Sequence, residues 1–314
     1  MYSIGMDTSG YTTSLAAVNL KSEVVLDERV QLQVKAGEKG LRQSKAVFQH
    51  IKNIPLLMER LSEKVSGKDI VCFSASVKPR PVEKSYMPVF KVGESFAKSF
   101  SSTAAVPFFF TTHQEGHLWS ALYSLEEQPE VFLALHISGG TTELMKVNKE
   151  DLEMKIQLIG GSSDLPLGQF IDRIGVKIGL PFPCGPHLEE LGKESKKPVG
   201  VPVSVKGCLT SYSGPLSHVE RLLDSVENPA DLARGVEICA ARSLEAILHQ
   251  AVKETGIKKV VIAGGVSSNK FIRQQLIENI SDGLLFFAAP ELSSDNAVGV
   301  SLYGLKKWER RHRL

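Results

Sequence analysis

The sequence lacks closely spaced cysteines. Its four cysteines are scattered along 314 residues, at Cys72, Cys184, Cys208 and Cys239. This spacing argues against a disulfide framework and against a zinc knuckle. We expect four reduced thiols, most of them buried.

Long apolar runs and an excess of charge of one sign are missing as well. No hydrophobic run approaches the roughly 18 residues of a membrane helix, and Asp7 interrupts the apolar N-terminus. We therefore expect no signal peptide, no membrane partner and a cytoplasmic location. The net charge of +2 favours no class of partner. With 42% hydrophobic and 23% charged residues, the chain is long enough for two cored globular domains.

One short segment occurs twice. Residues 5–19 (GMDTSGYTTSLAAVN) align without a gap on residues 134–148 (ALHISGGTTELMKVN). A chance similarity is one explanation, because Ser, Gly and Thr are common in β-turns. We favour duplication, with two α/β domains that each open with a hairpin. The backbone N–H groups of two such turns facing each other would hold a phosphate chain between them.

Two histidines four residues apart mark the most informative motif, His113-Gln114-Glu115-Gly116-His117. The apolar stretch 108–110 predicts a strand, and Thr111 or Thr112 would cap a following helix that carries both rings on one face. Gly116 disfavours a helix, so a neighbour needs the room. The motif indicates a metal site or simply two packed or solvated histidines. A third ligand must come from elsewhere, and the motif is not that of the zincins.

The remaining pattern is α/β. It predicts strands at 2–6, 13–19, 24–33, 70–75, 258–263 and 284–289, and helices over 41–64, 88–102, 167–179 and 228–256. Gly264-Gly265 forms a strand-to-helix turn, either a plain tight turn or an anion site. Asp295 precedes the last helix and would cap it, complete a site with the two histidines, or do both. The tail 306–313 combines basic residues with Trp308, which suits nucleic acid or a solvated helix end.

These motifs resemble those of the tRNA N6-adenosine threonylcarbamoyltransferase family, formerly described as O-sialoglycoprotein endopeptidases. The His113 segment is similar to the family's HxEGH motif, and residues 293–297 (SSDNA) to its C-terminal aspartate motif. The resemblance implies that His113, His117 and Asp295 bind one Fe²⁺ or Zn²⁺ ion. His136 is a possible fourth ligand, since archaeal and eukaryotic relatives have a tyrosine there.

The resemblance extends to the nucleotide site. The family's phosphate and substrate loop falls on His136, Ile137, Ser138, Gly139 and Gly140. Residues that hold the ribose, base and phosphates of the adenylate fall on Asp172, Gly185, Glu189 and Asn269. Residues 211–214 (SYSG) resemble the family's SFSG loop.

The implied fold is α/β, with two duplicated ribonuclease-H-like domains of the actin and sugar-kinase superfamily and an active site in the interdomain cleft. The expected domains are 1–128 plus 291–314, which carries the metal-binding helix, and 129–290, which carries the adenylate-binding loops. The implied partners are threonylcarbamoyl-AMP (or ATP or AMP), tRNA, a paralogous subunit, an ATPase and the enzyme that makes the adenylate.

The implied reaction transfers threonylcarbamate from its adenylate to N6 of adenosine 37 in ANN-decoding tRNAs. Several departures indicate a divergent branch. The family's Asp-Asp-Ala-Ala-Gly-Glu stretch appears as residues 164–169, with Leu165 and Gln169 in place of carboxylates. Its Gly-Pro-Gly loop appears as residues 78–81 (KPRP), and its N-terminal Cys-Asp-Glu-Thr is absent. A non-catalytic nucleotide-binding paralogue is the alternative, and a metallopeptidase using Glu115 as base is a third hypothesis. Lys78, Arg80 and the basic tail are the candidate tRNA contacts.

Overall fold

The computed structural model describes residues 1–314 except 35–40, 124, 127, 282 and 313–314. The chain divides into two compact units. Unit 1 comprises Met1–Glu126, Asp151–Glu153 and Glu291–Leu314, and unit 2 comprises Glu127–Glu150 and Met154–Pro290. Unit 1 is therefore assembled from both ends of the chain.

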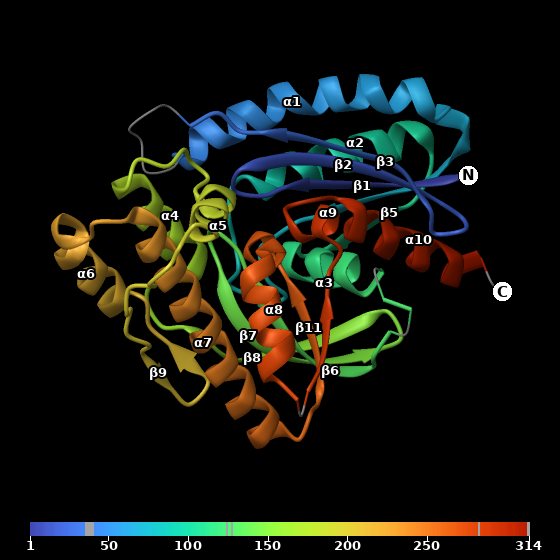
Figure 1. The fold of residues 1–314 in the computed structure, drawn as a ribbon. Helices are drawn as coiled ribbons and strands as arrows, with labels where there is room; N and C mark the ends of the chain where they lie inside the picture. Colours follow the sequence, from blue (N-terminus) through green and yellow to red (C-terminus); the bar gives the residue numbers. More distant parts are fainter. Residues whose placement is uncertain (35–40, 124, 127, 282, 313–314) are drawn as a thin grey trace. The chain divides into compact units, whose positions relative to one another are not determined.

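Unit 1 is a five-stranded sheet with helices on both faces. The strand order is β3-β2-β1-β4-β5, in which β1, β2 and β3 are antiparallel while β4 and β5 run parallel to β1. Figure 1 shows α1 and α2 on one side of this sheet and α3 and α10 on the other. The elements are β1 (Tyr2–Thr8), β2 (Thr12–Asn19), β3 (Val24–Gln31), α1 (Gln43–Lys64), η1 (Gly67–Asp69), β4 (Ile70–Ser76), α2 (Phe90–Ala104), β5 (Phe108–Thr111), α3 (His113–Tyr123), α9 (Pro290–Ser293) and α10 (Val298–His312).

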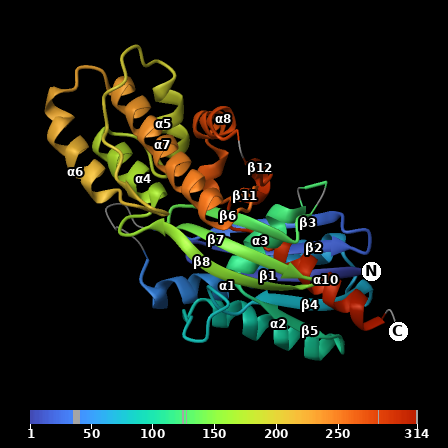
Figure 2. The ribbon, with the colours of Figure 1, turned by 90° about the horizontal axis from the view of Figure 1, so that it is seen from below.

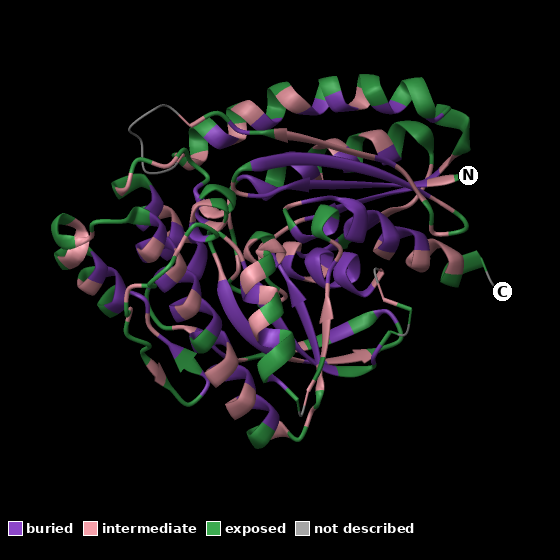
Figure 3. Ribbon diagram, viewed as in Figure 1, coloured by how far each residue is buried: buried purple, intermediate pink, exposed green. Residues whose placement is uncertain are grey.

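The two faces of β1 differ in side-chain size. Ile4 and Met6 join the core formed with α1 and α2, where β1 and β2 are almost wholly buried (Figure 3). Ser3 and Gly5 alternate with them and contact α10. A Cβ on Gly5 would lie 2.5 Å from Ala297 O, so only glycine fits there. This small-residue face lets α10 lie directly on the sheet.

A second close approach joins α10 to α3. A Cβ on Gly299 would lie 1.9 Å from the carbonyl oxygen of Gly116, and one on Gly116 would lie 3.0 Å from Val300. Ser120 Oγ also accepts a hydrogen bond of 2.9 Å from Gly299 N. The glycine inside the histidine motif is thus explained by helix packing, since the neighbour that needs the room is α10.

Unit 2 has a seven-stranded sheet in the order β12-β11-β6-β7-β8-β10-β9. Its core packs the long α7 against the sheet, and α4 and α5 contact α7 (Figure 2). The elements are β6 (Val131–Ile137), β7 (Thr142–Glu150), β8 (Glu153–Ser162), α4 (Leu167–Lys177), α5 (Gly185–Gly192), β9 (Val205–Lys206), β10 (Leu209–Thr210), α6 (Ser213–Leu222), η2 (Leu223–Ser225), α7 (Pro229–Thr255), β11 (Lys259–Ala263), η3 (Gly265–Ser268), α8 (Lys270–Asn279) and β12 (Leu284–Phe287).

The two units repeat one topology. The order β8-β7-β6-β11-β12 in unit 2 matches β3-β2-β1-β4-β5 in unit 1. The hairpins also share a register: Tyr2 pairs with Asn19 and Thr8 with Thr13, while Val131 pairs with Asn148 and Ile137 with Thr142. These pairs are related by the same offset as the repeated sequence segments. The fold is therefore the predicted α/β duplication of the actin and sugar-kinase type.

The structure refines several element boundaries. The 88–102 helix begins at Phe90, because Pro88 and Val89 form the turn before it. The prolines at 181–186 also indicate a rigid loop, but Gly185-Pro186 belongs to the first turn of α5. The short strands β9 and β10 and the helix α6 were not predicted. All four cysteines are free and buried, as expected. Among the described residues, no helix has both the length and the apolar character needed to cross a bilayer.

The helix crossing generates a stability prediction. Gly299→Ala places a methyl group against the backbone of α3, so the two helices must separate, and we expect a loss of about 1–3 kcal/mol. Gly67→Ala is the control in the same unit, because no heavy atom lies within 4 Å of its added Cβ. Urea unfolding midpoints measure both. Equal midpoints for the two variants would contradict the role of the crossing.

Candidate metal centre and nucleotide-binding loops

A capping box starts the helix that carries both histidines. Thr112 donates to Glu115 Oε2 through its N–H (2.9 Å) and its hydroxyl (2.7 Å), and Glu115 N donates back to Thr112 Oγ1 at 3.2 Å. This reciprocal pair satisfies N–H groups that a helix start leaves open. It begins α3 at His113, so the two imidazoles lie one turn apart on the same face.

Three ligand-type atoms converge on this face. His113 Nε2 and His117 Nε2 are 3.2 Å apart, and Asp295 Oδ1 lies 3.7 Å from the former and 3.3 Å from the latter. Asp295 Oδ2 accepts a hydrogen bond of 2.8 Å from Ser9 Oγ, which orients the carboxylate. Within the described residues, these three side chains form the group whose ligand atoms all lie within 4.8 Å of one another.

Asp7 holds His113 from the opposite side of its ring. Asp7 Oδ2 lies 2.9 Å from His113 Nδ1 and accepts a 2.5 Å hydrogen bond from Ser76 Oγ, and Asp7 is almost fully buried. In the neutral ring, a carboxylate at Nδ1 holds the proton on that nitrogen and leaves Nε2 as the lone-pair nitrogen, which is the form in which His113 could bind an ion. The ring is thus oriented with Nε2 toward His117 and Asp295.

The electrostatics of the cluster favour positive charge. Burial opposes the charged form of His113, but Asp7 and then Asp295 outweigh it and raise its pKa to about 9. Burial likewise opposes ionisation of Asp295, yet hydrogen bonding to His117 and the charge of His113 hold its pKa well below the usual range. Two ionised carboxylates therefore surround the imidazoles.

Asn296, and not Asp295, satisfies the start of α10. Asn296 Oδ1 accepts a hydrogen bond of 2.9 Å from Val298 N and one of 2.8 Å from Ser120 Oγ. Its amide group donates to the carbonyls of Leu292 and Ser294. The helix-cap alternative for Asp295 is therefore wrong, since its neighbour has that role and leaves the Asp295 carboxylate to the histidines.

The predicted phosphate loop lies in unit 2 and is packed from two sides. A Cβ on Gly168, in the first turn of α4, would lie 2.5 Å from Ser138 O, and one on Gly264 would lie 2.3 Å from Ile137 O. Gly139 and Gly140 face open space, since a Cβ added to either would have no heavy atom within 4 Å. The loop backbone is thus packed against Gly168 and Gly264, while Gly139 and Gly140 face open space. His136 lies buried at the end of β6, and its role as a ligand stays a prediction.

The four predicted nucleotide residues form two local pairs. Asp172 Oδ1 accepts a 2.8 Å hydrogen bond from Cys184 N, which places Asp172 beside Gly185 at the start of α5. Glu189 Oε1 accepts a 2.8 Å bond from Lys270 N, which places Glu189 beside Asn269 at the start of α8. Asn269 Oδ1 caps α8 by accepting from Ile272 N at 2.8 Å. Each pair links residues distant in sequence.

Sequence reasoning missed Glu237 and Arg234, which lie behind this second pair. Glu237 is fully buried on α7, Oε1 accepts a 2.8 Å hydrogen bond from Asn269 Nδ2, and Oε2 lies 2.8 Å from Arg234 Nη1. The Arg234 guanidinium stacks 3.9 Å from the centre of the Phe271 ring. The available signal was a carboxylate on the apolar face of a helix, between Val236 and Cys239.

The SFSG-like loop closes on Asp164, the carboxylate retained in the 164–169 stretch. Asp164 accepts hydrogen bonds from the hydroxyls of Ser211 and Ser213 and from Tyr212 N at 3.0 Å. Burial opposes ionisation, but these hydrogen bonds together outweigh it and hold the pKa of Asp164 far below its usual range. The two motifs thus form one ordered structure.

Comparison with known proteins relates the chain to one family of tRNA-modifying enzymes. Residues 25–301 match the family described as tRNA N6-adenosine threonylcarbamoyltransferase (TsaD). The chain is 31% identical to the tRNA N6-adenosine threonylcarbamoyltransferase of Thermus thermophilus, over 100% of this chain and 94% of that protein. It is 26% identical to a probable bifunctional tRNA threonylcarbamoyladenosine biosynthesis protein of Methanocaldococcus jannaschii, over 97% of this chain and 55% of that protein.

Solved structures with the same fold are more distant in sequence. The activator of 2-hydroxyisocaproyl-CoA dehydratase from Clostridium difficile, solved with ADPNP, aligns with a TM-score of 0.59 at 15% identity, over 100% of this chain and 97% of that one. A ROK-family glucokinase from Streptomyces griseus, solved with glucose and AMPPNP, aligns with a TM-score of 0.54 at 12% identity, over 97% and 99%. These likenesses concern the fold.

Glu237 generates a prediction about pH. Burial raises its pKa from 4.5 to about 7, although Asn269 and Arg234 counteract part of the shift. Because the folded pKa exceeds the unfolded one, Glu237 favours the folded state below pH 4.5 and loses that contribution as the pH rises through 7. The loss is about 3 kcal/mol at most.

The neutral isostere Glu237→Gln removes this titration. We therefore expect the stability of the wild type, relative to the variant, to fall between pH 5 and pH 8. Urea unfolding at the two pH values measures this difference. A constant difference between the two proteins would show that Glu237 does not titrate in this range.

Proposed function

The chain belongs to the tRNA N6-adenosine threonylcarbamoyltransferase family, and from this membership we propose that it transfers the threonylcarbamoyl group of threonylcarbamoyl-AMP to N6 of adenosine 37 in ANN-decoding tRNAs. The amine nitrogen forms a bond to the carbamoyl carbon, the bond from that carbon to the phosphate oxygen breaks, AMP leaves, and N6 loses a proton. Direct transfer of this kind requires no protein nucleophile.

The observation that supports this proposal best is the His113, His117 and Asp295 triangle. A tetrahedral ion with bonds of about 2.0–2.1 Å separates its ligand atoms by about 3.3 Å, and the observed separations are 3.2, 3.3 and 3.7 Å. Two imidazoles and a carboxylate are also the donors that Fe²⁺ and Zn²⁺ accept. The residues therefore fit one such ion, which when bound would polarise a carbonyl or phosphoryl oxygen as a Lewis acid.

The surrounding residues of unit 1 would preset this geometry. Asp7 and Ser76 hold the His113 ring, Ser9 holds Asp295, and the capping box of α3 holds the spacing of the two histidines. Ligands that are already oriented lose little freedom when they bind, which favours a single productive placement of the substrate.

In unit 2, we assign the adenylate to the loops around Ser138 to Gly140 and Gly264-Gly265. A Cβ added to Gly139, Gly140 or Gly265 would have no heavy atom within 4 Å, which leaves room for phosphate oxygens beside these loops. The carboxylates of Asp172 and Glu189 suit ribose hydroxyls. Asn269 would contact the base through the amide hydrogen that Glu237 does not use. Two proteins of the same fold were solved with ADPNP and with AMPPNP, and we propose a nucleotide role for this chain as well.

Two other functions compete with transfer. A non-catalytic nucleotide-binding paralogue is favoured by the loss of carboxylates at Leu165, which packs in the core of unit 2, and at Gln169. A metallopeptidase would need Glu115 as its base, but that carboxylate accepts three hydrogen bonds from Thr111 and Thr112 in the capping box. The peptidase hypothesis is thereby weakened.

Partners and location complete the proposal. The relative described as a probable bifunctional protein supports a partner system in this pathway. We include the family's paralogous subunit, ATPase and adenylate-forming enzyme as partners, and a cytoplasmic site of action, where free thiols such as these four persist.

The decisive test is transfer of labelled threonylcarbamate from threonylcarbamoyl-AMP to an ANN-decoding tRNA, with metal-loaded protein and the family's partner proteins. We expect His113→Ala to reduce transfer by at least about 100-fold, since several kcal/mol of charge stabilisation are lost. His218→Ala, at a partly exposed position on α6, is the control and should transfer normally. A wild type that binds the adenylate but transfers nothing would support the non-catalytic alternative.

A separate prediction concerns Asp7 and uses metal affinity as its readout. Asp7→Asn keeps the size of the side chain but removes the negative charge that fixes His113. We expect the affinity for Zn²⁺ to fall about 10–100-fold, measured by competition with a chromophoric chelator. Asp69→Asn, at an exposed position in η1, should bind as the wild type does. Unchanged affinity in the Asp7 variant would remove its positioning role.

A further inference from the structure

The segment from Lys78 to Tyr86, which we call the basic loop, is fixed at its start to the histidine helix. His113 N donates to Lys78 O and Gln114 N donates to Pro79 O, each at 3.0 Å. These are N–H groups of the first turn of α3, which have no partner inside the helix. The loop backbone therefore caps the helix at the residue that begins the metal triangle.

The residues that follow the loop return to the same histidine. Phe90 is buried, and its ring centre lies 5.7 Å from that of His113. Thr8 Oγ1 donates to Val89 O at 2.9 Å, next to the residue that holds the His113 ring. Both ends of the basic loop are thus tied to His113 or its supports, so the loop has a defined position beside the proposed site.

The basic loop is ordered by its own hydrogen bonds. Arg80 N donates to Ser85 Oγ at 3.0 Å, Ser85 N donates to Val82 O at 3.1 Å, and Lys78 Nζ donates to Val82 O at 3.2 Å. These bonds draw Arg80 close to residues 84–86. The chain therefore presents a compact tip rather than an extended strand.

The tip carries cations beside an exposed aromatic ring. Arg80 and Lys84 are exposed, and Tyr86 keeps 65% of its surface accessible. Across Lys78 to Tyr86 there are three cations and one acid, Glu83. Cations that meet phosphates next to a ring on which a base stacks are the combination that binds single-stranded nucleic acid.

The other basic segment lacks this combination. On the last turns of α10, Lys306 pairs with Glu309, Lys307 with Glu153, and Arg310 with Asp151. Trp308 packs against the cluster of Val71, Cys72 and Phe109. Arg313, at the end of the expected contact tail, lies outside the described residues. The tail's charges and ring are therefore largely engaged within unit 1.

We propose that the basic loop binds the unpaired anticodon-loop nucleotides of the substrate tRNA, with Arg80 and Lys84 on phosphates and Tyr86 stacked on a base. This inference rests on the proposed transfer function. The target adenosine lies in the anticodon loop, and a protein contact tied to His113 would hold the neighbouring nucleotides at a set distance from the proposed metal site.

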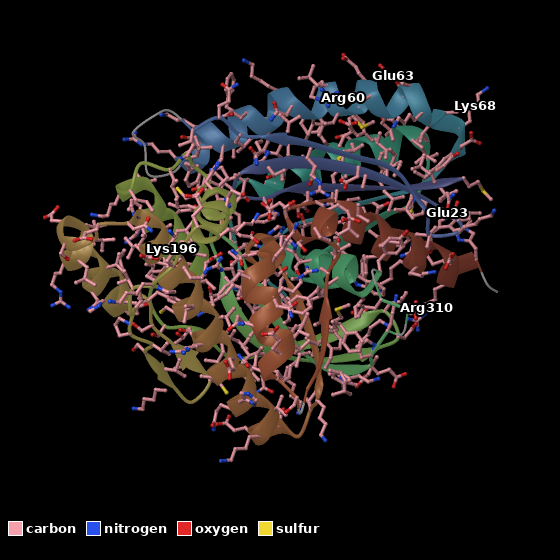
Figure 4. All side chains as sticks on the ribbon, in the orientation of Figure 1. Glu23, Arg60, Glu63, Lys68, Lys196 and Arg310 are labelled. Atoms are coloured by element: carbon pink, nitrogen blue, oxygen red, sulfur yellow. The ribbon has the colours of Figure 1, made fainter. Side chains whose placement is uncertain are left out.

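The test measures RNA binding by fluorescence anisotropy with the full-length chain and the partner proteins of the transfer assay. The probes are a labelled anticodon stem–loop of an ANN-decoding tRNA and a duplex made of the same stem. The variants are Arg80→Gln with Lys84→Gln, Tyr86→Leu and Tyr86→Phe. The matched control is Lys64→Gln with Lys68→Gln, which removes the same charge at the opposite end of β4, where Lys68 projects beyond α1 (Figure 4).

We expect the double charge variant to bind the stem–loop about tenfold more weakly and to lower the slope of log affinity against log salt by about 1.5. Tyr86→Leu should weaken binding about fivefold or more, while Tyr86→Phe keeps the ring and the affinity. The lysine control and duplex binding should change little. Unaltered thermal unfolding midpoints in all variants will show that these changes do not reflect misfolding.

Three results would overturn the inference. If the loop variants bind the stem–loop as tightly as the wild type and transfer is intact, the basic loop is not an RNA contact, but the proposed transferase function stands. If the loop variants lose equal affinity for the stem–loop and for the duplex, the basic loop does not contact unpaired nucleotides specifically. A wild type that neither binds the stem–loop nor transfers threonylcarbamate removes the proposed function together with the inference.

Discussion

The close packing of α10 is the constraint on which unit 1 depends. Asp295 stands almost 180 residues after His117, so only the position of α10 brings the three side chains together. That position requires glycine at two backbone contacts, Gly5 against Ala297 and Gly299 against Gly116. A methyl group at either point would separate the elements by more than the sub-ångström tolerance of a ligand set. The backbone packing of α10 therefore also determines whether the three candidate ligands meet in this unit.

Residues around the three candidate ligands fix the orientation of the His113 ring and of the Asp295 carboxylate. The Asp7 carboxylate selects the tautomer of His113, Ser9 selects the rotation of Asp295, and Asn296 satisfies α10 so that Asp295 need not. None of these contacts adds a ligand. Each reduces the number of arrangements open to the three that are present, which is the usual way a protein prepares a site before its ligand arrives.

Much of the fold could be predicted from the sequence, because its signals are local. The repeated segments predicted the duplication and the two hairpins, and the structure adds that both hairpins share one register. Asn228-Pro229 and Gly256 predicted the ends of α7, where an Asn cap and a left-handed glycine occur. The short strands β9 and β10 escaped prediction because two residues carry no periodicity.

The candidate site was predictable in its ligand types but not in their supports. The spacing of His113 and His117 indicated a common face, whereas the contact of Asp7 with His113 depends on β1 pairing with β4 beside β5. Glu237 was missed because a single acid in an apolar helix has no spacing to reveal its partner, Asn269 on another helix. Such residues are defined by tertiary contacts alone.

Unit 1 is assembled from both ends of the chain, and this affects the order in which its parts can fold during translation. Strands β1 to β5 emerge first, but the face of β1 that carries Ser3 and Gly5 packs against α10, which is synthesised much later. Most of unit 2 is synthesised between them and can bury its own core at once. During translation, the contact surface for α10 on β1 and β4 therefore stays unfilled until that helix leaves the ribosome, and unit 1 is completed after most of unit 2 has been synthesised.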